Sequence, residues 1–252
     1  MKLAVAGKGG AGKTSISGTL SRLLARSGRK VLAIDGDPNP NLAITLGIPP
    51  ERLPELPVLA SDLLERGPGG PTLKRSLPEI CAEYSVSGPD GVTLLVMAMP
   101  QHAGTGCLCS MHATVRMIIE AASDSAGEVC LLDTEASPEH LSRGNAQYAD
   151  LMLTVVEPYY KSLETGRRMV ILARDLGLER APLVANKIRN DKDLEAVRLF
   201  ARKHDLEIVG AVPYDSSFPE AEQAGVAPLD LAPDSAAVAA IASIARELVP
   251  GG

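Results

Sequence analysis

The sequence contains no tryptophan, and only 3% of its residues are aromatic. The core of this 252-residue chain, 45% hydrophobic, must therefore be built mainly from Ala, Val, Leu and Ile. No stretch approaches the roughly 18 apolar residues that a membrane span needs. A strand-like apolar run begins at Leu3, which leaves no room for a signal peptide. We therefore expect a cytoplasmic protein that forms a single α/β domain over residues 1–252.

An excess of positive charge is also lacking: 25 Lys and Arg against 31 Asp and Glu give a formal net charge of −6, the isoelectric point is about 5.3, and no run of Lys and Arg stands out. Proteins that bind nucleic acids or anionic membranes are more often basic or carry a basic patch, so we expect neither partner. The four cysteines of a cytoplasmic chain are expected to be thiols or metal ligands, not disulfides.

The most informative stretch is GKGGAGKTS at residues 7–15. It follows an apolar run, Leu3–Ala6, and precedes a helical pattern with apolar residues at 16, 20, 23 and 24. Strand, glycine loop and helix are the context that a phosphate-binding P-loop requires. The alternative is a plain glycine-rich turn, which does not need the complete motif.

In a P-loop, glycines let backbone N–H groups converge on phosphate oxygens, and the following helix directs its positive dipole end at the same anion. We expect Lys13 to reach the β- and γ-phosphates, the Thr14 hydroxyl to ligate Mg²⁺, and Ser15 to bind a more proximal phosphate. The predicted nucleotide contacts of the loop are Gly9, Gly10, Ala11, Gly12, Lys13, Thr14 and Ser15.

A second lysine, Lys8, lies inside the loop ahead of Lys13. With it, the loop resembles that of the deviant Walker A ATPases, whose pattern is KGGxGK[ST]. This family includes MinD, ParA, the nitrogenase iron protein and the nickel-insertion ATPases of carbon monoxide dehydrogenase. The resemblance implies an ATP-dependent homodimer in which Lys8 crosses the interface to the partner's nucleotide. The alternative is an exposed lysine that only adds charge beside a phosphate.

Two acidic residues follow predicted core strands. The run at residues 30–34 ends in DGDP, and the run at residues 128–133 ends in Asp133. A carboxylate at the carboxyl end of a strand beside a P-loop faces the phosphates. The resemblance implies that Asp37 orients or activates the attacking water, although an Asp before Pro is also typical of a turn. Asp133 has the form of a Walker B acid, which would hold Mg²⁺ through water.

The rest of the chain alternates strand-like and helical patterns. This alternation predicts a P-loop NTPase fold of the α/β class, in which a mostly parallel sheet is covered by helices on both faces. The further strands are expected at residues 92–97, 151–156, 182–186 and 208–212, and the further helices around residues 165–175, 193–204 and 235–248.

Residues 48–91 are rich in Pro and Gly and predict a surface insertion that could bind a partner. Short helices are expected around Ala60–Arg66 and Leu77–Tyr84. Cys81, on an apolar helical face, and Cys130, within a strand, are interpreted as small buried hydrophobes.

Two late segments concern the base of the nucleotide. Asn186-Lys187 closes one predicted strand, and Pro213-Tyr214 follows the next. In the resembling family, an Asn at the first place and the backbone at the second hold adenine. The sequence from 186 to 189, NKIR, departs from the guanine motif NKxD at its acid, which favours adenine over guanine.

Cys107 and Cys109 form a CxC pair in a glycine-containing loop after a predicted core strand. Two thiols at this spacing in an extended loop point the same way. They could supply half of a tetrahedral site if a two-fold axis brings a second pair alongside. Thiolates suit Zn²⁺ and iron–sulfur centres, and Ni²⁺ can take a square-planar thiolate set. The alternative is a pair of incidental thiols.

The same loop resembles that of the nitrogenase iron protein, whose second cysteine follows the Walker B acid by seven residues. Here that place is taken by His140. The CxC pair, Glu139-His140 and the segment 150–166 instead resemble the CooC-type nickel-insertion ATPases. That resemblance implies Ni²⁺ or Zn²⁺ at the dimer interface and a client such as carbon monoxide dehydrogenase. His102, His112 and His140 could assist the metal, although a histidine in such a place is more often structural or a hydrogen-bond partner of a ligand.

Two other functions compete with metal insertion. One is a MinD- or ParA-like spatial organiser, and the other is an iron–sulfur electron-transfer ATPase. Residues 235–248 are rich in Ala with Arg246 as their only cation, unlike a basic membrane-surface helix. Glu135 and Ser137 replace the glycines that some relatives carry after the Walker B acid, which leaves open how this loop couples to the γ-phosphate.

Overall fold

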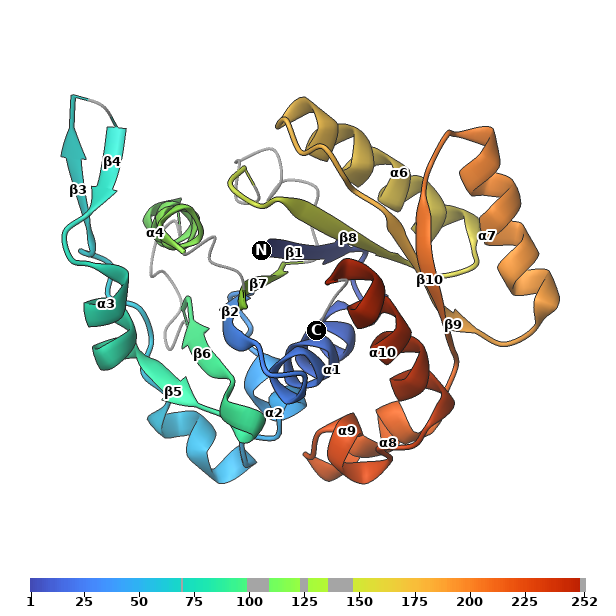
Figure 1. The fold of residues 1–252 in the computed structure, drawn as a ribbon, viewed down its shortest axis with the longest axis horizontal. Coiled ribbons are helices and arrows are strands. Elements are labelled where there is room, and N and C mark those ends of the chain that lie inside the picture. The colour runs from blue at the N-terminus through green and yellow to red at the C-terminus, as the bar shows by residue number, and fades with distance from the viewer. Residues whose placement is uncertain (69, 99–108, 123–126, 136–146, 250–252) are drawn as a thin grey trace.

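The computed structural model describes residues 1–68, 70–98, 109–122, 127–135 and 147–249. Helices lie on both sides of a central sheet, which confirms the predicted α/β fold (Figure 1). The strands pair in parallel except at the β5 edge, where β5 and β6 are antiparallel. In spatial order the sheet contains β10 (Ile208–Pro213), β9 (Leu183–Ile188), β8 (Leu151–Val156), β1 (Lys2–Gly7), β7 (Glu128–Thr134), β2 (Lys30–Gly36), β6 (Thr93–Val96) and β5 (Ser85–Ser87).

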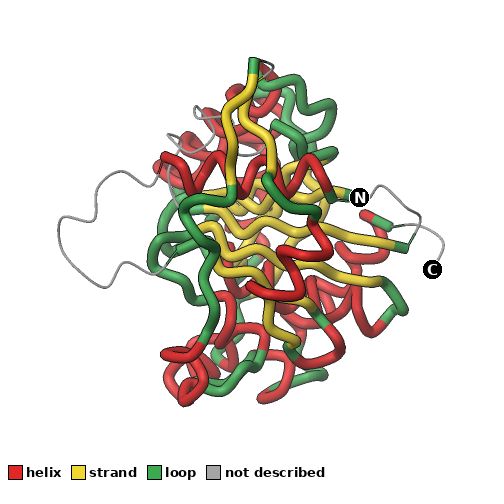
Figure 2. The backbone as a smooth tube through the Cα atoms, turned by 90° about the vertical axis from the view of Figure 1, so that its left-hand side faces the viewer, coloured by secondary structure: helices red, strands yellow, loops and turns green. Residues whose placement is uncertain are grey.

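The helices connect these strands along the chain (Figures 1 and 2). In the described part of the chain they are α1 (Lys13–Arg26), α2 (Leu42–Leu46), α3 (Leu77–Tyr84), α4 (Cys109–Ala121), α6 (Tyr160–Asp175), α7 (Asp191–Lys203), α8 (Ser217–Ala224), α9 (Pro228–Leu231) and α10 (Ala236–Leu248). Two short 3₁₀ helices, Pro50–Glu55 and Pro89–Gly91, complete this list. Among these residues no helix is both long enough and apolar enough to cross a bilayer.

Strand β1 shows how the sheet is covered on both faces. Successive side chains of a strand point to opposite faces. Leu3 and Val5 therefore join the cluster that includes α1 and α10, whereas Ala4 and Ala6 join the cluster beneath α6. All four are at most 1% exposed, which is why this strand reads as a continuous apolar run and not as an alternating one.

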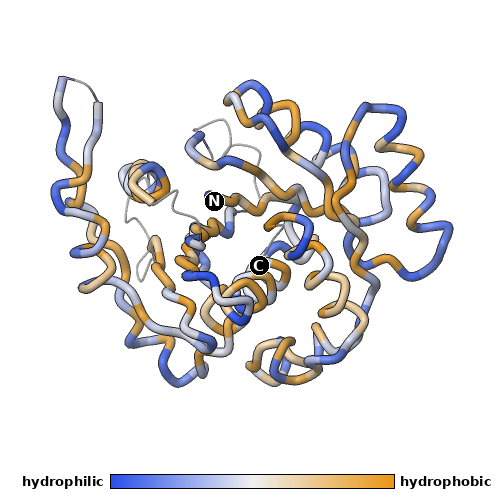
Figure 3. The backbone as a smooth tube through the Cα atoms, in the orientation of Figure 1, coloured by the Kyte–Doolittle hydropathy of each residue, from blue (hydrophilic) through white to orange (hydrophobic). Residues whose placement is uncertain are grey.

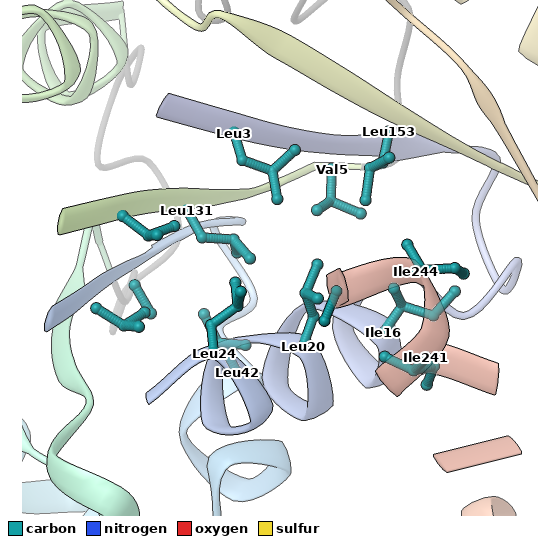
Figure 4. Close-up of a cluster of buried hydrophobic side chains, with 14 of the residues drawn as sticks. Leu3, Val5, Ile16, Leu20, Leu24, Leu42, Leu131, Leu153, Ile241 and Ile244 are labelled. Carbon is teal, nitrogen blue, oxygen red and sulfur yellow. The ribbon is translucent and has the colours of Figure 1, made fainter. Parts of the chain in front are cut away.

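Helix α1, which carries the end of the P-loop, packs its predicted apolar face on the sheet. Ile16, Leu20 and Leu24 belong to one buried cluster with residues of the strands, α2 and α10 (Figure 4). Each is at most 2% exposed, and burying such a side chain stabilises the fold by about 1.5–3 kcal/mol. The start of α1 is therefore held in place by its own core contacts.

Helix α7 packs at the β9–β10 end of the sheet, and its outer side is mostly hydrophilic (Figure 3). It buries Val197 and Ala201, and its Asn190 side chain caps the first turn by accepting a hydrogen bond from the Asp193 N–H. The predicted helices over 165–175, 193–204 and 235–248 are all present, the first beginning five residues earlier at Tyr160.

Residues 48–91 differ from the prediction in two ways. The expected helix over 60–66 is wrong, because Leu64–Gly67 forms β3 and pairs antiparallel with β4 (Gly70–Leu73). Gly67, Pro68 and Gly70 favour a turn and oppose a helix, and Gly70 adopts a φ of 110°. The hairpin projects beyond the central sheet in both views (Figures 1 and 2).

Residues 48–91 also contribute to the core. The sequence predicted only a surface insertion here. Strand β5 is the edge of the central sheet, and Ile48 and Ile80 are at most 2% exposed. The predicted helix over 77–84 is confirmed, with a capping box between Ser76 and Glu79. Of the two structural cysteines, Cys130 is buried as predicted. Cys81 is only half-buried.

Candidate nucleotide-binding site

The carboxyl ends of the parallel strands meet at one edge of the sheet, where open α/β folds bind ligands. A cavity of about 480 Å³ opens there, between the P-loop and the segments that follow β8, β9 and β10. The predicted nucleotide contacts that line it are Gly10, Gly12, Lys13, Thr14, Ser15, Asn186, Lys187, Pro213 and Tyr214. Of the other two, Gly9 is exposed on the loop and Ala11 is buried beneath it.

Gly12 is required by both conformation and space. Its φ of 94° lies in the left-handed region, and an added Cβ would lie 2.3 Å from the Asn186 Nδ2. The next residue, Lys13, begins α1, whose first turn has neither an acidic residue nor a side-chain cap. Residues of that turn line the cavity, and the N–H groups of a helix's first turn lack partners within the helix, as in an anion-binding helix terminus.

Asp133 joins β7 to α1 through two hydrogen bonds. The Thr14 hydroxyl donates to its Oδ2 at 2.7 Å, and the Ser17 hydroxyl donates to its Oδ1 at 2.9 Å. Burial raises the pKa of Asp133 to about 6, while these two bonds and the Lys13 charge oppose that rise. Sequence reasoning missed Ser17, although it lies three residues after Thr14 and therefore on the same face of α1.

Lys13 is 6% exposed at the bottom of the site. Burial lowers the pKa of its amine, and the charges of Asp133, Asp37 and Glu135 oppose that shift. The ammonium and three carboxylates therefore form one electrostatic group, in which added phosphate charge would favour the protonated lysine.

The structure places Asp37 both near the catalytic lysine candidate and in a turn. Its charge acts on Lys13 and Asp133, and its Oδ1 accepts a hydrogen bond from the Asn39 N–H at 2.8 Å. The two interpretations of Asp37, as a site residue and as a turn former, are thus compatible.

Asp35 is a site residue that sequence reasoning missed. It is fully buried, and its carboxylate accepts hydrogen bonds from the N–H groups of Leu42 at 2.8 Å and Asp37 at 3.2 Å. Burial, followed by the charge of Asp133, raises the pKa of Asp35 to about 8. Asp35 therefore ties the loop that carries Asp37 to the end of β2. Its only signal in the sequence is the DxD spacing.

The base end of the cavity is formed by β9 and β10. The Asn186 Nδ2 donates to the Ala11 carbonyl at 2.7 Å, which attaches the end of β9 to the P-loop. The Arg189 guanidinium lies 3.7 Å from the centre of the Tyr214 ring, and both line the cavity. Arg189 occupies the position of the acid in the guanine motif NKxD. From the sequence, this position served only as evidence against guanine, and Arg189 was not identified as a site residue.

Residues 2–229 match the family model described as the CobQ/CobB/MinD/ParA nucleotide binding domain. The chain belongs to this family of P-loop ATPases. It is 38% identical over 242 residues to the carbon monoxide dehydrogenase accessory protein CooC of Rhodospirillum rubrum, covering 92% of this chain and 91% of that protein. It is 36% identical over 233 residues to an uncharacterised ATP-binding protein of Methanocaldococcus jannaschii, covering 89% and 90%.

A solved member of the same fold is the septum site-determining protein MinD of Pyrococcus horikoshii, complexed with Mg-ADP. It aligns with a TM-score of 0.76 at 20% sequence identity, over 99% of this chain and 96% of that one. At this identity the similarity establishes the shared fold.

Membership of the CobQ/CobB/MinD/ParA family implies ATP or ADP and Mg²⁺ as ligands, and the site fits them. The Thr14 hydroxyl and the Asp133 carboxylate supply the oxygen atoms that Mg²⁺ prefers. The cavity is lined by Thr14, by the buried Lys13 and by the first turn of α1, which suit a polyphosphate, and Asp133 lies directly behind Thr14.

Most of the predicted cysteine site lies outside the described residues. Cys107, His102, His140 and Ser137 lie outside the described residues, and Cys109 is described only as the first residue of α4. His112 is 6% exposed on α4. Within the described ranges, no three His, Cys, Asp or Glu side chains are grouped as a metal site.

Proposed function

We propose that this ATPase acts as a homodimer that closes around ATP and thereby assembles a nickel site for delivery to a client metalloenzyme, such as a carbon monoxide dehydrogenase. The observation that carries the proposal is the identity to CooC over 92% of the chain. Cys107 and Cys109 support it, because two CxC pairs provide the four thiolates of a tetrahedral or square-planar site.

In this proposal, Lys13 and the first turn of α1 neutralise the charge of the terminal phosphates. The Thr14 hydroxyl oxygen and the Asp133 Oδ2 lie 2.7 Å apart, and these two groups would hold Mg²⁺. When bound, that ion neutralises charge on the β- and γ-phosphates. Asp37 orients the attacking water, while Asp35 restrains the Asp37 loop through the two N–H groups that it accepts. Hydrolysis then depends mainly on positioning and charge neutralisation.

Lys8 acts across the dimer interface. Lys8 is half-buried and its amine makes an exposed contact with Tyr159, whereas Lys13 is 6% exposed in the site. A lysine of a phosphate-binding loop whose amine is open to solvent is suitably placed to reach the nucleotide of a second copy. ATP would therefore draw two subunits together, and hydrolysis would release them and loosen the cysteine site.

Nickel is the cargo in this scheme, and Zn²⁺ is the other ion that the thiolates would accept. Thiolate ligands must lose their protons, so affinity should weaken as pH falls through the range in which thiols titrate. The site should hold one ion per dimer, and the ion should stabilise the dimer because it binds only where both copies meet.

Metal titration followed by sedimentation, with Mg²⁺ and a slowly hydrolysed ATP analogue, tests this proposal. The double variant Cys107→Ser/Cys109→Ser should lose the ion and keep nucleotide binding. Cys81→Ser, which removes a half-buried thiol of α3, is the matched control and should bind like the wild type. One tightly bound ion per monomer, or undiminished binding in the double variant, would favour a MinD- or ParA-like spatial organiser.

A further inference from the structure

Lys8 and Lys13 belong to the same loop but have different surroundings. Lys13 is 6% exposed and lies among the charges of Asp133 and Asp37. Lys8 is half-buried, and its Nζ lies 3.3 Å from the hydroxyl oxygen of Tyr159 and 5.4 Å from the centre of the Tyr159 ring. An ammonium within about 6 Å of an aromatic face is attracted to it. Tyr159 therefore offers Lys8 both an oxygen acceptor and a ring.

Tyr159 is oriented by an acid. Its hydroxyl donates to the Glu157 Oε2 at 2.7 Å, and the Glu157 Oε1 lies 3.1 Å from the Lys187 Nζ. Lys187 in turn donates to the Gly10 carbonyl. The only hydroxyl hydrogen of Tyr159 is committed to Glu157, so its lone pairs accept from Lys8. Three hydrogen bonds and one ion pair thus link these residues into a continuous chain that begins and ends on the P-loop.

We propose that Tyr159 holds Lys8 against its own subunit in the nucleotide-free monomer, and thereby sets how readily two copies close around ATP. This inference rests on the proposed function, because it requires Lys8 to act on the partner's nucleotide. An ammonium engaged by the Tyr159 ring and hydroxyl must leave them to reach a phosphate on a second copy. The contact therefore favours the open monomer, and closure has to break it.

The contact can be removed, together with the Tyr159–Glu157 bond, while the backbone start of α6 is kept. The Tyr159 side chain is 41% exposed, and the residue precedes α6 as its N-cap. It is the Tyr159 backbone carbonyl that accepts hydrogen bonds from Ser162 and Leu163 at the start of that helix. A substitution at 159 thus removes the Lys8 contact and keeps the backbone bonds that begin α6.

Two variants divide the contact into its parts. Tyr159→Phe keeps the ring and loses the oxygen, whereas Tyr159→Ala loses both. Sedimentation velocity with Mg²⁺ and a slowly hydrolysed ATP analogue should show tighter dimerisation, by about threefold for Phe and about tenfold for Ala. Tyr160→Phe is the matched control, because the Tyr160 ring is 72% exposed and contacts Phe200. It should dimerise like the wild type, and weaker or unchanged dimerisation of the Tyr159 variants would overturn the proposal.

A second measurement examines the contact in the monomer alone. An amine-acylating ester is added to the nucleotide-free protein, and modification of Lys8 is quantified by mass spectrometry relative to Lys30, whose side chain is 86% exposed. Acylation of Lys8 should rise in both Tyr159 variants and stay at the wild-type level in Tyr160→Phe. Equal acylation in all of them would overturn the holding contact. If the wild type stays monomeric with nucleotide, the proposed function fails, and this measurement still decides whether Tyr159 holds Lys8.

Discussion

Asp35 and Asp133 lie opposite each other on the parallel strands β2 and β7, and both carboxylates are buried. Each has a different set of donors: backbone N–H groups for Asp35, and the hydroxyls of Thr14 and Ser17 for Asp133. Asp35 thus organises the loop after β2, while Asp133 organises the start of α1. Their proximity raises the pKa of Asp35 further, beyond the effect of burial.

The raised pKa of Asp35 predicts a pH-dependent stability of the protein without nucleotide and Mg²⁺. An unfolded Asp titrates near pH 3.9, but the folded protein keeps this proton up to about pH 8. The contribution of Asp35 to the free energy of unfolding is therefore fully present below about pH 4 and is lost as pH rises toward 8, by at most about 1.4 kcal/mol per pH unit for one proton. Urea unfolding between pH 5 and 8 should give a flatter profile for Asp35→Asn. Asp62→Asn, at an exposed position, should keep the wild-type slope. Equal slopes for wild type and Asp35→Asn would contradict the prediction.

Substitution of the two lysines of the loop should affect nucleotide binding and ATP hydrolysis differently. Lys13→Ala should abolish nucleotide binding, because it removes the buried charge that faces the terminal phosphates. Lys8→Ala should retain much of the binding and lose hydrolysis, since its charge acts in the closed dimer. Titration calorimetry and steady-state ATPase rates distinguish these outcomes. Equal ATPase rates for the wild type and Lys8→Ala would refute the role of Lys8 across the interface.

Gly12→Ala should impair both stability and nucleotide binding. The positive φ alone costs about 1 kcal/mol, and the new Cβ would also displace the Asn186 amide, 2.3 Å away. Gly28→Ala is a matched control, because its φ is 87° with no atom within 4 Å of the added Cβ. It should lose about 1 kcal/mol of stability and bind nucleotide normally.

The double variant Gly12→Ala/Asn186→Ala checks the steric part of this explanation. Truncating Asn186 makes room for the new Cβ but also removes the bond to Ala11. Chemical denaturation should therefore show a cost smaller than the sum of the two single substitutions. Additive costs would mean that the Gly12 requirement is conformational alone.

Arg22 should be a larger contributor to stability than its neighbour Arg26. Its side chain is 3% exposed, and its guanidinium contacts Asp90 and Asp230 at 2.6 Å each. Arg22→Met should cost about 2 kcal/mol, since both carboxylates lose a buried partner and are themselves partly solvated. Arg26→Met removes a 42%-exposed guanidinium that also contacts Asp90, and should cost less than about 1 kcal/mol. Thermal or urea unfolding of the two variants provides the comparison, and equal losses would contradict it.

The features that could be predicted from the sequence are those in which the signal is local. The P-loop is one continuous segment, and Asp133 directly ends a strong apolar run, so spacing alone located them. Alternation of strands and helices was enough for the sheet, because buried parallel strands have continuous apolar runs. The resemblance to a known family supplied the roles that spacing could not.

The features that were missed depend on contacts between distant parts of the chain. The Asn186–Ala11 bond and the stacking of Arg189 on Tyr214 join segments whose proximity no local pattern indicates. The predicted helix over 60–66 overlaps the first strand of the hairpin at 64–73, because helical spacing of a few apolar residues does not show the pairing of β3 with β4. Asp35 was passed over because its importance lies in burial, which a hydrophilic residue type does not suggest.

The order of strands in the sheet also determines the order in which this protein can be completed during synthesis. Strand β1 is made first, yet its two neighbours are β7 and β8, and the Met1 amino group bonds the Glu128 carbonyl 127 residues later. A nascent chain that ends before β8 leaves an apolar strand without its partners, which is the kind of segment that aggregates or recruits chaperones. The Ala11 carbonyl can accept its hydrogen bond from Asn186 only after β9 has been synthesised, later than β8. A ribosome-bound chain should therefore gain a competent nucleotide site only after β9 has emerged.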